Sequence, residues 1–406
     1  MEKALKIAEE IDERACLDVL SELVQFKSYS ETDGERDLAH RMVEIMSSMG
    51  LEAYPQKIEN ERINAIGIWR GTGGGQSILF NGHLDTNPAT EGWTVDPWGG
   101  LIDDKFIYGI GVSNMKAGDA ASLCAVHTLI EKGKRLKGDV VLTYVVGELQ
   151  GGVGTYEAVK SGIKADYFIN SEPTDLQAIT MHAEAFVFNI ELTGITRHLS
   201  KREEAVDAIR AACDLIPRLS EMTFSDAPSE EHRGINRVHV GTIRGALGRG
   251  FEEWRPPQVA DFVRLKGSGR IGPGQSLESA EADIRLVLDN LEADWPGLST
   301  KITIEKRDGQ ASMPAFKVKK EARIVTSLNS AFEMVRGYPQ PTGAITPPGF
   351  YGTDAGHLYL HGGMQGVVCG PGGRYNTMPD ERVDLQDYLD MVRIYLITIC
   401  DICGME

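Results

Sequence analysis

The stretch "SILFNGHLD", residues 77–85, decides the fold class, because an apolar run here ends on a histidine and an aspartate two positions apart. Three other segments are equally rich in apolar and β-branched residues and are bounded by Gly or Asp: 63–71, 138–148 and 165–172. Residues 117–133, between two of them, have a helical pattern. Buried strands that alternate with helices predict an α/β sheet, covered by helices on both faces.

Polar side chains follow the expected strands at the point where each strand ends. They are His83 with Asp85, then Asn114, Glu148 and Glu172. In open α/β sheets, ligands bind at the carboxyl ends of the strands. We therefore expect the functional site at this edge of the sheet.

The pattern changes near residue 184, where strands begin to alternate polar and apolar residues. Over 184–312 the expected order is strand, helix, strand, strand, helix, strand, which is a ferredoxin-like unit. The mixed pattern then resumes. We expect a catalytic α/β domain formed by 1–183 and 313–406, with 184–312 inserted as a lid or dimerisation domain.

Composition narrows the class of protein further. The 406 residues carry 42 Lys and Arg against 59 Asp and Glu, a formal net charge of −17, which disfavours nucleic acid or an anionic membrane as the partner. No run approaches the ~20 apolar residues of a membrane-spanning helix, and the N-terminal residues show no signal-peptide pattern. Six scattered cysteines indicate reduced thiols, so a cytoplasmic location is expected.

Five ordered segments carry a family resemblance. They are "NGHLDTNP" (81–88), "WTVDPWGGLIDDKFIYGIGVSNMKAG" (93–118), "VVGELQGGVGT" (145–155), "NSEPTDL" (170–176) and "GPGGRYNTMPDE" (370–381). Together they resemble the M20 metallopeptidase/amidohydrolase family, close to the acetylornithine deacetylase and succinyl-diaminopimelate desuccinylase type. The likeness covers nearly the whole chain, and it implies a zinc-aminopeptidase-like catalytic domain and a homodimer formed through the inserted domain.

The resemblance also implies a mechanism. In the family, two zinc ions share a bridging carboxylate and activate a water molecule that hydrolyses an amide or peptide bond. The matching positions imply that His83 and Glu172 are ligands of one ion and that Asp85 orients His83. They further imply that Glu148 is the general base and that His198, from the neighbouring subunit's lid, helps hold the oxyanion.

Three ligand positions depart from the family pattern. Asn114 stands where the bridging aspartate is expected, and Leu149 and Thr377 stand where the second ion has its own ligands. The second ion would therefore have no strong protein ligand. We expect at most one divalent ion, with zinc as the candidate, held by His83, Glu172 and the Asn114 carbonyl oxygen.

The remaining site residues have expected roles as well. Leu149 should desolvate Glu148 and raise its pKa, which suits an acid–base residue near neutral pH. Lys116, together with His198, should stabilise developing negative charge. Contact with the substrate is expected from Asn114, Arg270, Thr377 and His357.

Three hypotheses for the function follow. The first is an amidohydrolase-like enzyme that cleaves a C–N amide bond in a small, carboxylate-bearing amino-acid derivative. The second is a metal-independent hydrolase, lyase or isomerase that uses the same pocket. The third is a catalytically silent member of the family that binds a ligand or a partner.

Overall fold

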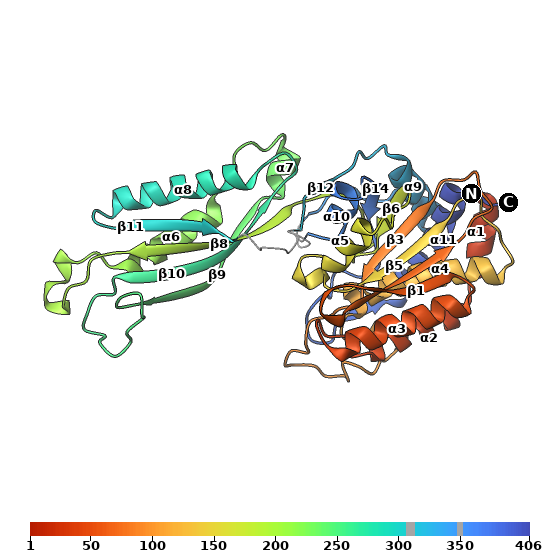
Figure 1. The fold of residues 1–406 in the computed structure, drawn as a ribbon, viewed down its shortest axis with the longest axis horizontal. Helices are drawn as coiled ribbons and strands as arrows, with labels where there is room; N and C mark the ends of the chain where they lie inside the picture. Colours follow the sequence, from red (N-terminus) through yellow and green to blue (C-terminus); the bar gives the residue numbers. More distant parts are fainter. Residues whose placement is uncertain (306–312, 347–351) are drawn as a thin grey trace. The chain divides into compact units, whose positions relative to one another are not determined.

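The computed structural model describes residues 1–305, 313–346 and 352–406 (Figure 1). The chain divides into two compact units, one formed by Met1–Met181 and Phe316–Glu406 and the other by His182–Ala315. The expected insert began at residue 184 and ended at residue 312, and this last position lies outside the described residues.

The first unit is built on a mixed sheet with the strand order β1-β2-β5-β3-β6-β14-β7-β12, with β13 beside β7. β3 runs parallel to both β5 and β6, whereas β2 is antiparallel to β5. The strands are β1 (Glu52–Lys57), β2 (Ile63–Trp69), β3 (Ile78–His83), β5 (Val140–Val145), β6 (Tyr167–Asn170), β7 (Ala178–His182), β12 (Phe316–Lys317), β13 (Thr342–Ala344) and β14 (Gln365–Val368).

Helices cover both faces of this sheet, as successive residues of β3 demonstrate. The ring of Phe80 contacts Tyr395 in α11 (Leu385–Cys403), whereas the amide of Asn81 donates to Thr155 in α5 (Val153–Lys160). Neighbouring side chains of a strand point to opposite faces, so α5 and α11 lie on opposite sides. The expected α/β class is confirmed. The other helices of this unit are α1 (Glu2–Ala8), α2 (Glu13–Gln25), α3 (Asp33–Ser48), α4 (Ala117–Glu131), α9 (Arg323–Arg336) and α10 (Ala355–Leu360).

One expectation about the strands was wrong. The strand that precedes Asn114, β4 (Phe106–Tyr108), does not belong to the central sheet but pairs with β15 (Arg382–Asp384) in a separate two-stranded sheet. Asn114 lies in a short helical turn, η2 (Val112–Lys116), that leads into α4. A run of three strand residues carries no information about which sheet it joins, so the sequence pattern did not reveal this.

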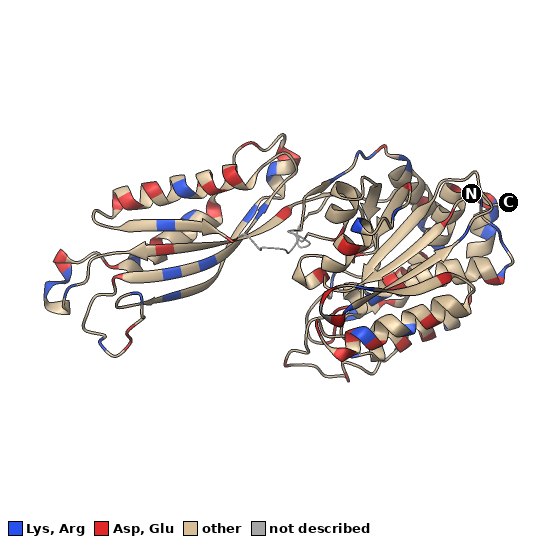
Figure 2. Cartoon of the chain, viewed as in Figure 1, with Lys and Arg blue, Asp and Glu red and all other residues tan. Residues whose placement is uncertain are grey.

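The second unit has the ferredoxin-like order of elements. Its antiparallel sheet has the strand order β11-β8-β10-β9, and the helices α6 and α8 share a buried apolar core with it. In Figure 2, the charged positions of α8 are mostly acidic, whereas those of the strands are mostly basic. The elements are β8 (Glu184–Thr193), α6 (Ala208–Glu221), α7 (Glu230–Gly234), β9 (Arg237–Ala246), β10 (Phe262–Ile271), α8 (Leu277–Asp294) and β11 (Ser299–Ile304).

Within the described ranges, no helix combines the length and the apolar composition that crossing a membrane requires.

Candidate active site

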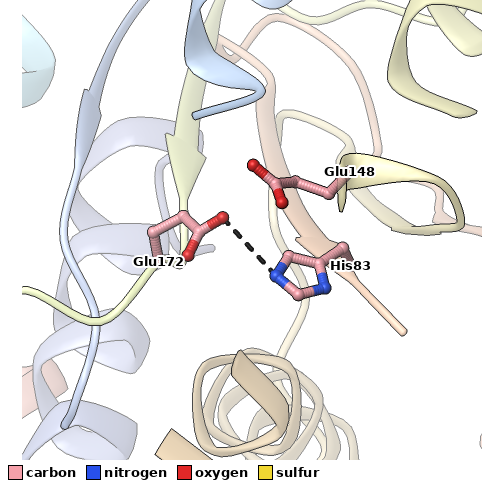
Figure 3. A group of neighbouring side chains, drawn as sticks. All are labelled: His83, Glu148 and Glu172. Carbon is pink, nitrogen blue, oxygen red and sulfur yellow. Dashed lines mark ion pairs between the residues drawn. The ribbon is translucent and has the colours of Figure 1, made fainter. Parts of the chain in front are cut away.

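Three strands of the central sheet bring the candidate residues together. β5, β3 and β6 are neighbours and run parallel, so their carboxyl ends meet at one edge. His83 is the last residue of β3, Glu148 opens the turn after β5, and Glu172 follows β6. Figure 3 shows the three side chains converging, and their ligand atoms all lie within 4.8 Å of one another.

The hydrogen bonds of His83 fix the orientation of its ring. Its Nδ1 lies 2.8 Å from the backbone carbonyl oxygen of Asp85, and because a carbonyl only accepts, Nδ1 carries the hydrogen. In the neutral ring, Nε2 then presents a lone pair. It faces Asn114 Oδ1 at 3.3 Å and Glu172 Oε1 at 3.6 Å.

These distances fit a divalent metal ion. Zinc bonds to nitrogen and oxygen at about 2.0–2.1 Å, so two ligand atoms of a tetrahedral site lie about 3.3 Å apart. The spacings of His83 Nε2 from Asn114 Oδ1 and Glu172 Oε1, 3.3 and 3.6 Å, are close to that value. A carboxylate oxygen of Glu148 lies within 4.8 Å of the ligand atoms of His83 and Glu172, so it could bind the same ion. The sequence predicts only an acid–base role for Glu148, whereas the geometry offers it as a ligand too.

The protonation equilibria of the cluster show a strongly negative local potential. Burial raises the pKa of Glu148 well above its usual range, and the charge of Glu172 raises it further. Burial also raises the pKa of Glu172 to about 7. Burial lowers the pKa of His83, but the charges of Glu172 and Asp85 outweigh this effect and raise it to about 10. Such a cluster favours a bound cation, whether a proton or a metal ion.

Asp85 has a different task from the one expected. Its carboxylate lies 3.7 Å from Nδ1 of His83, and the backbone carbonyl takes that hydrogen bond instead. The fully buried carboxylate accepts hydrogen bonds from three backbone N–H groups, those of Gly147, Glu148 and Leu149. Gly147 has φ of 80°, a conformation that glycine adopts without strain. Asp85 therefore holds the turn that presents Glu148.

A buried ion pair behind this turn was missed by the sequence argument. Arg62 donates two hydrogen bonds to Glu35, at 2.7 and 2.6 Å, and a third to Gln150 at 3.3 Å. The side chains of Arg62 and Glu35 are only 8% and 1% exposed. Ser30 connects this network to the site, because its hydroxyl donates to Asp85 at 2.7 Å and lies 3.2 Å from the Gln150 oxygen that accepts from Arg62. No local pattern links these positions, so only the fold reveals the network.

Glu381 supports the other side of the site. Its buried carboxylate accepts the backbone N–H groups of Ser113 and Asn114 at 2.9 and 3.0 Å. These bonds hold the turn from which Asn114 reaches His83. Burial raises the pKa of Glu381 to about 7. Glu381 lies in one of the five segments that carry the family resemblance, but no role is expected of it from the sequence.

Two cavities meet at the cluster. The larger, of about 520 Å³, is lined by Glu148, Glu172 and the exposed Arg374, among others. The smaller, of about 260 Å³, extends from His83 in another direction. Three residues line both cavities: Asn114, Leu149 and Thr377.

Two of the expected site residues line neither cavity. Lys116 is fully buried, and its ammonium group donates to the carbonyl of Phe26 at 2.9 Å. Burial lowers the pKa of Lys116 to about 7. His357 is also buried, and its Nε2 donates to the carbonyl of Gly151 at 2.8 Å. In this structure, both side chains support backbone rather than face a ligand.

Two further expected residues belong to the second unit. His198 precedes the short helix η4 (Leu199–Glu204), is exposed, and accepts the backbone N–H of Ser200. The guanidinium of Arg270 is partly buried and donates to Ser268 and to the carbonyl of Gly269.

Residues 79–401 match the sequence profile of peptidase family M20/M25/M40, and the chain belongs to this family. The expected family and the assignment as a hydrolase are both confirmed.

Curated relatives span most of the chain. An N-formyl-4-amino-5-aminomethyl-2-methylpyrimidine deformylase of Bacillus subtilis (strain 168) is 26% identical over 369 residues, which cover 84% of each protein. An acetylornithine deacetylase of Aliivibrio salmonicida (strain LFI1238) is 24% identical, covering 76% of this chain and 80% of that protein.

Solved structures share the fold. The aminopeptidase PepT from Bacillus cereus ATCC 10987 aligns with a TM-score of 0.77 at 20% identity, covering 97% of this chain and 99% of that one. Human carnosine dipeptidase 1 aligns with a TM-score of 0.72 at 14% identity, covering 99% of both chains.

Proposed function

We propose that the protein hydrolyses an amide bond in a small, carboxylate-bearing amino-acid derivative and holds at most one divalent ion. The observation that carries the proposal is the spacing of His83 Nε2, Asn114 Oδ1 and Glu172 Oε1, with the carboxylate of Glu148 beside them. The names of two relatives support an acyl amide as the substrate, because one relative is a deformylase and the other a deacetylase.

Each residue of the site has its own role in the proposed reaction. A divalent ion at this position would polarise the amide carbonyl and acidify a water molecule. Glu148, with its raised pKa, accepts a proton from the water and returns it to the leaving amine. Asp85 keeps Glu148 in place through the backbone of its turn. Arg374, in the wall of the larger cavity, pairs with the carboxylate of the substrate.

A single ion is the favoured stoichiometry because the second ion would lack ligands. Leu149 offers no donor atom, and the neutral hydroxyl of Thr377 is a weak ligand. Asn114 contributes an amide oxygen without charge. Glu172 and Glu148 are then the negatively charged groups among the candidate ligands. Their two charges suit one divalent ion.

The proposal includes a cytoplasmic homodimer. All six cysteines are free, and five of them are buried, which supports a reducing compartment. The exposed edge strand β9 of the inserted unit offers backbone groups for pairing with a second copy.

Metal analysis tests the stoichiometry. The protein is saturated with zinc and the unbound zinc is then removed. It is expected to retain about one zinc ion per chain, measured by elemental mass spectrometry. His83→Ala and Glu172→Ala should each lose this ion, whereas His127→Ala, a control at a side chain that is 44% exposed on α4, should keep it. Two tightly bound ions per chain would contradict the proposal. Full turnover after chelation would favour the metal-independent hydrolase, lyase or isomerase.

Metal affinity should rise with pH, because the ion displaces protons from the ligands. In the metal-free protein, His83 with a pKa of about 10 is protonated near neutrality, and Glu172 with a pKa of about 7 is protonated below that value. Each proton displaced changes the affinity about tenfold per pH unit. We therefore expect the affinity to rise by at least about tenfold per pH unit between pH 6 and 8, measured by competition with a coloured chelator. An affinity that does not vary between pH 6 and 8 would contradict this ligand set.

A further inference from the structure

Asp119 has no role in the chemistry described so far. It stands in the first turn of α4, shortly after η2, the turn that presents Asn114. Its side chain lies against the end of β3, because a Cβ atom at Gly82 would collide with Oδ1 of Asp119. Glycine at this position therefore leaves room for the carboxyl group, one residue before His83.

The surroundings of this carboxyl group are unfavourable for the folded protein. Asp119 is fully buried, and neither of its oxygens has a hydrogen-bond partner among the described residues. The ammonium group of Lys116, one helical turn earlier, donates to the carbonyl of Phe26 instead. A buried polar group without a partner lowers stability, and proteins keep such groups mainly at functional sites. Packing alone would favour an apolar side chain here.

Electrostatic interaction connects Asp119 with the candidate cluster. Burial raises the pKa of Asp119 well above its usual range, and the positive charge of His83 lowers it. Burial lowers the pKa of His83, and the carboxylates around it, Asp119 among them, raise it. The two side chains therefore act on each other through their charges, without a hydrogen bond between them.

A divalent ion at the cluster would strengthen this interaction. In the metal-free protein, His83 presents the single positive charge of its proton. A bound ion replaces this proton and carries two positive charges, so its attraction for the ionised form of Asp119 is greater. The interaction is buried, which limits screening by salt and water. Because binding effects are reciprocal, a carboxylate that the ion stabilises must in turn raise the affinity for the ion.

We propose that Asp119 is a positioning residue of the metal centre. It contacts neither the ion nor the substrate, but its negative charge behind His83 helps to hold the ion at the cluster. This inference rests on the single divalent ion of the proposed function. It also gives a reason for keeping a buried carboxyl group that no neighbouring side chain satisfies.

The test is the affinity for zinc, measured at one fixed pH by competition with a coloured chelator. Asp119→Asn keeps the size of the side chain and removes the charge, so it should weaken zinc binding by about 10–100-fold. Asp119→Ala should have a similar effect. Ser122→Ala is the matched control, because the Ser122 hydroxyl donates to the backbone carbonyl of Asp119 and carries no charge. Its zinc affinity should stay within about twofold of the wild-type value.

Urea unfolding separates this role from a merely structural one. In the metal-free protein, Asp119→Asn should leave the unfolding midpoint close to the wild-type value, because the carboxyl group it replaces has no partner to lose. The rise of the midpoint on adding zinc should be smaller than in the wild-type protein, since a ligand stabilises according to its affinity. A lower midpoint in the metal-free protein together with unchanged zinc affinity would overturn the proposal.

Two further variants distinguish the remaining explanations. If Asp119 acted only by neutralising Lys116, adding Lys116→Met to Asp119→Asn would restore the zinc affinity, and this result would overturn the proposal. A loss that persists in the double variant supports it. His83→Ala tests the ion itself. If His83→Ala loses zinc while Asp119→Asn binds it as the wild-type protein does, only this inference fails. If His83→Ala keeps zinc, the proposed ligand set fails and this inference with it.

Discussion

Glu148→Gln is expected to lower kcat by about 10²–10⁴ while the affinity for the substrate changes little. The amide has nearly the shape of the carboxylate, but it cannot take a proton from water. Glu148 lies within 4.8 Å of the ligand atoms of His83 and Glu172, and its pKa is raised by burial and by Glu172. A raised pKa makes this carboxylate a stronger base than an ordinary glutamate, which suits proton abstraction from water. Steady-state kinetics and calorimetric binding of the same substrate measure the two effects separately.

The matched control for this change is Glu131→Gln on α4. The side chain of Glu131 is 60% exposed and lies outside both cavities, so kcat should stay within about twofold of the wild-type value. A kcat that survives Glu148→Gln would remove the proposed acid–base role. Ligand binding without turnover in the wild-type protein, unaffected by the substitution, would favour the catalytically silent alternative. The metal content of the variant must also be determined, because Glu148 is within reach of the ion as well.

Glu35→Ala is expected to lower the free energy of unfolding by about 3–5 kcal/mol. The carboxylate of Glu35 accepts two hydrogen bonds from Arg62, and both side chains are almost fully buried. Removing the carboxylate leaves the guanidinium of Arg62 buried with only the longer bond to Gln150. Urea unfolding followed by circular dichroism measures the loss.

Two comparisons separate the buried charge from other effects of this substitution. Asp18→Ala removes an exposed ion pair with Arg14 and should cost less than about 1 kcal/mol. The double variant Glu35→Leu with Arg62→Met leaves no buried charge, so it should be more stable than Glu35→Ala alone. A loss below about 1 kcal/mol for Glu35→Ala would show that the pair contributes little.

Much of the fold could be predicted from local sequence patterns. The apolar runs that end at His83 and near Glu148 and Glu172 form neighbouring parallel strands, as the pattern of buried strands and helices indicated. The alternating strands after residue 184 also form the ferredoxin-like sheet. These predictions succeed because burial of both faces of a strand leaves a continuous apolar run in the sequence, and burial of one face leaves an alternating pattern.

The roles of single side chains were less predictable. Lys116 was expected to face developing negative charge, but it is buried against the carbonyl of Phe26. Asp85 was expected to orient His83 through its carboxylate, but that carboxylate holds the backbone of the Glu148 turn. A motif gives the residue type and its place in the chain. It does not specify which of several nearby partners accepts the hydrogen bond.

The sequence by itself determined the family, the α/β class and the residues that stand at the ligand positions, because strand periodicity and ordered motifs are local properties of the chain. Only the tertiary structure decided that Asn114, Leu149 and Thr377 line both cavities and that Arg374 lies on one side of them. It also decided that Glu35 and Arg62 support the turn after β5. These contacts join segments far apart in the chain, and packing rather than local preference brings such segments together.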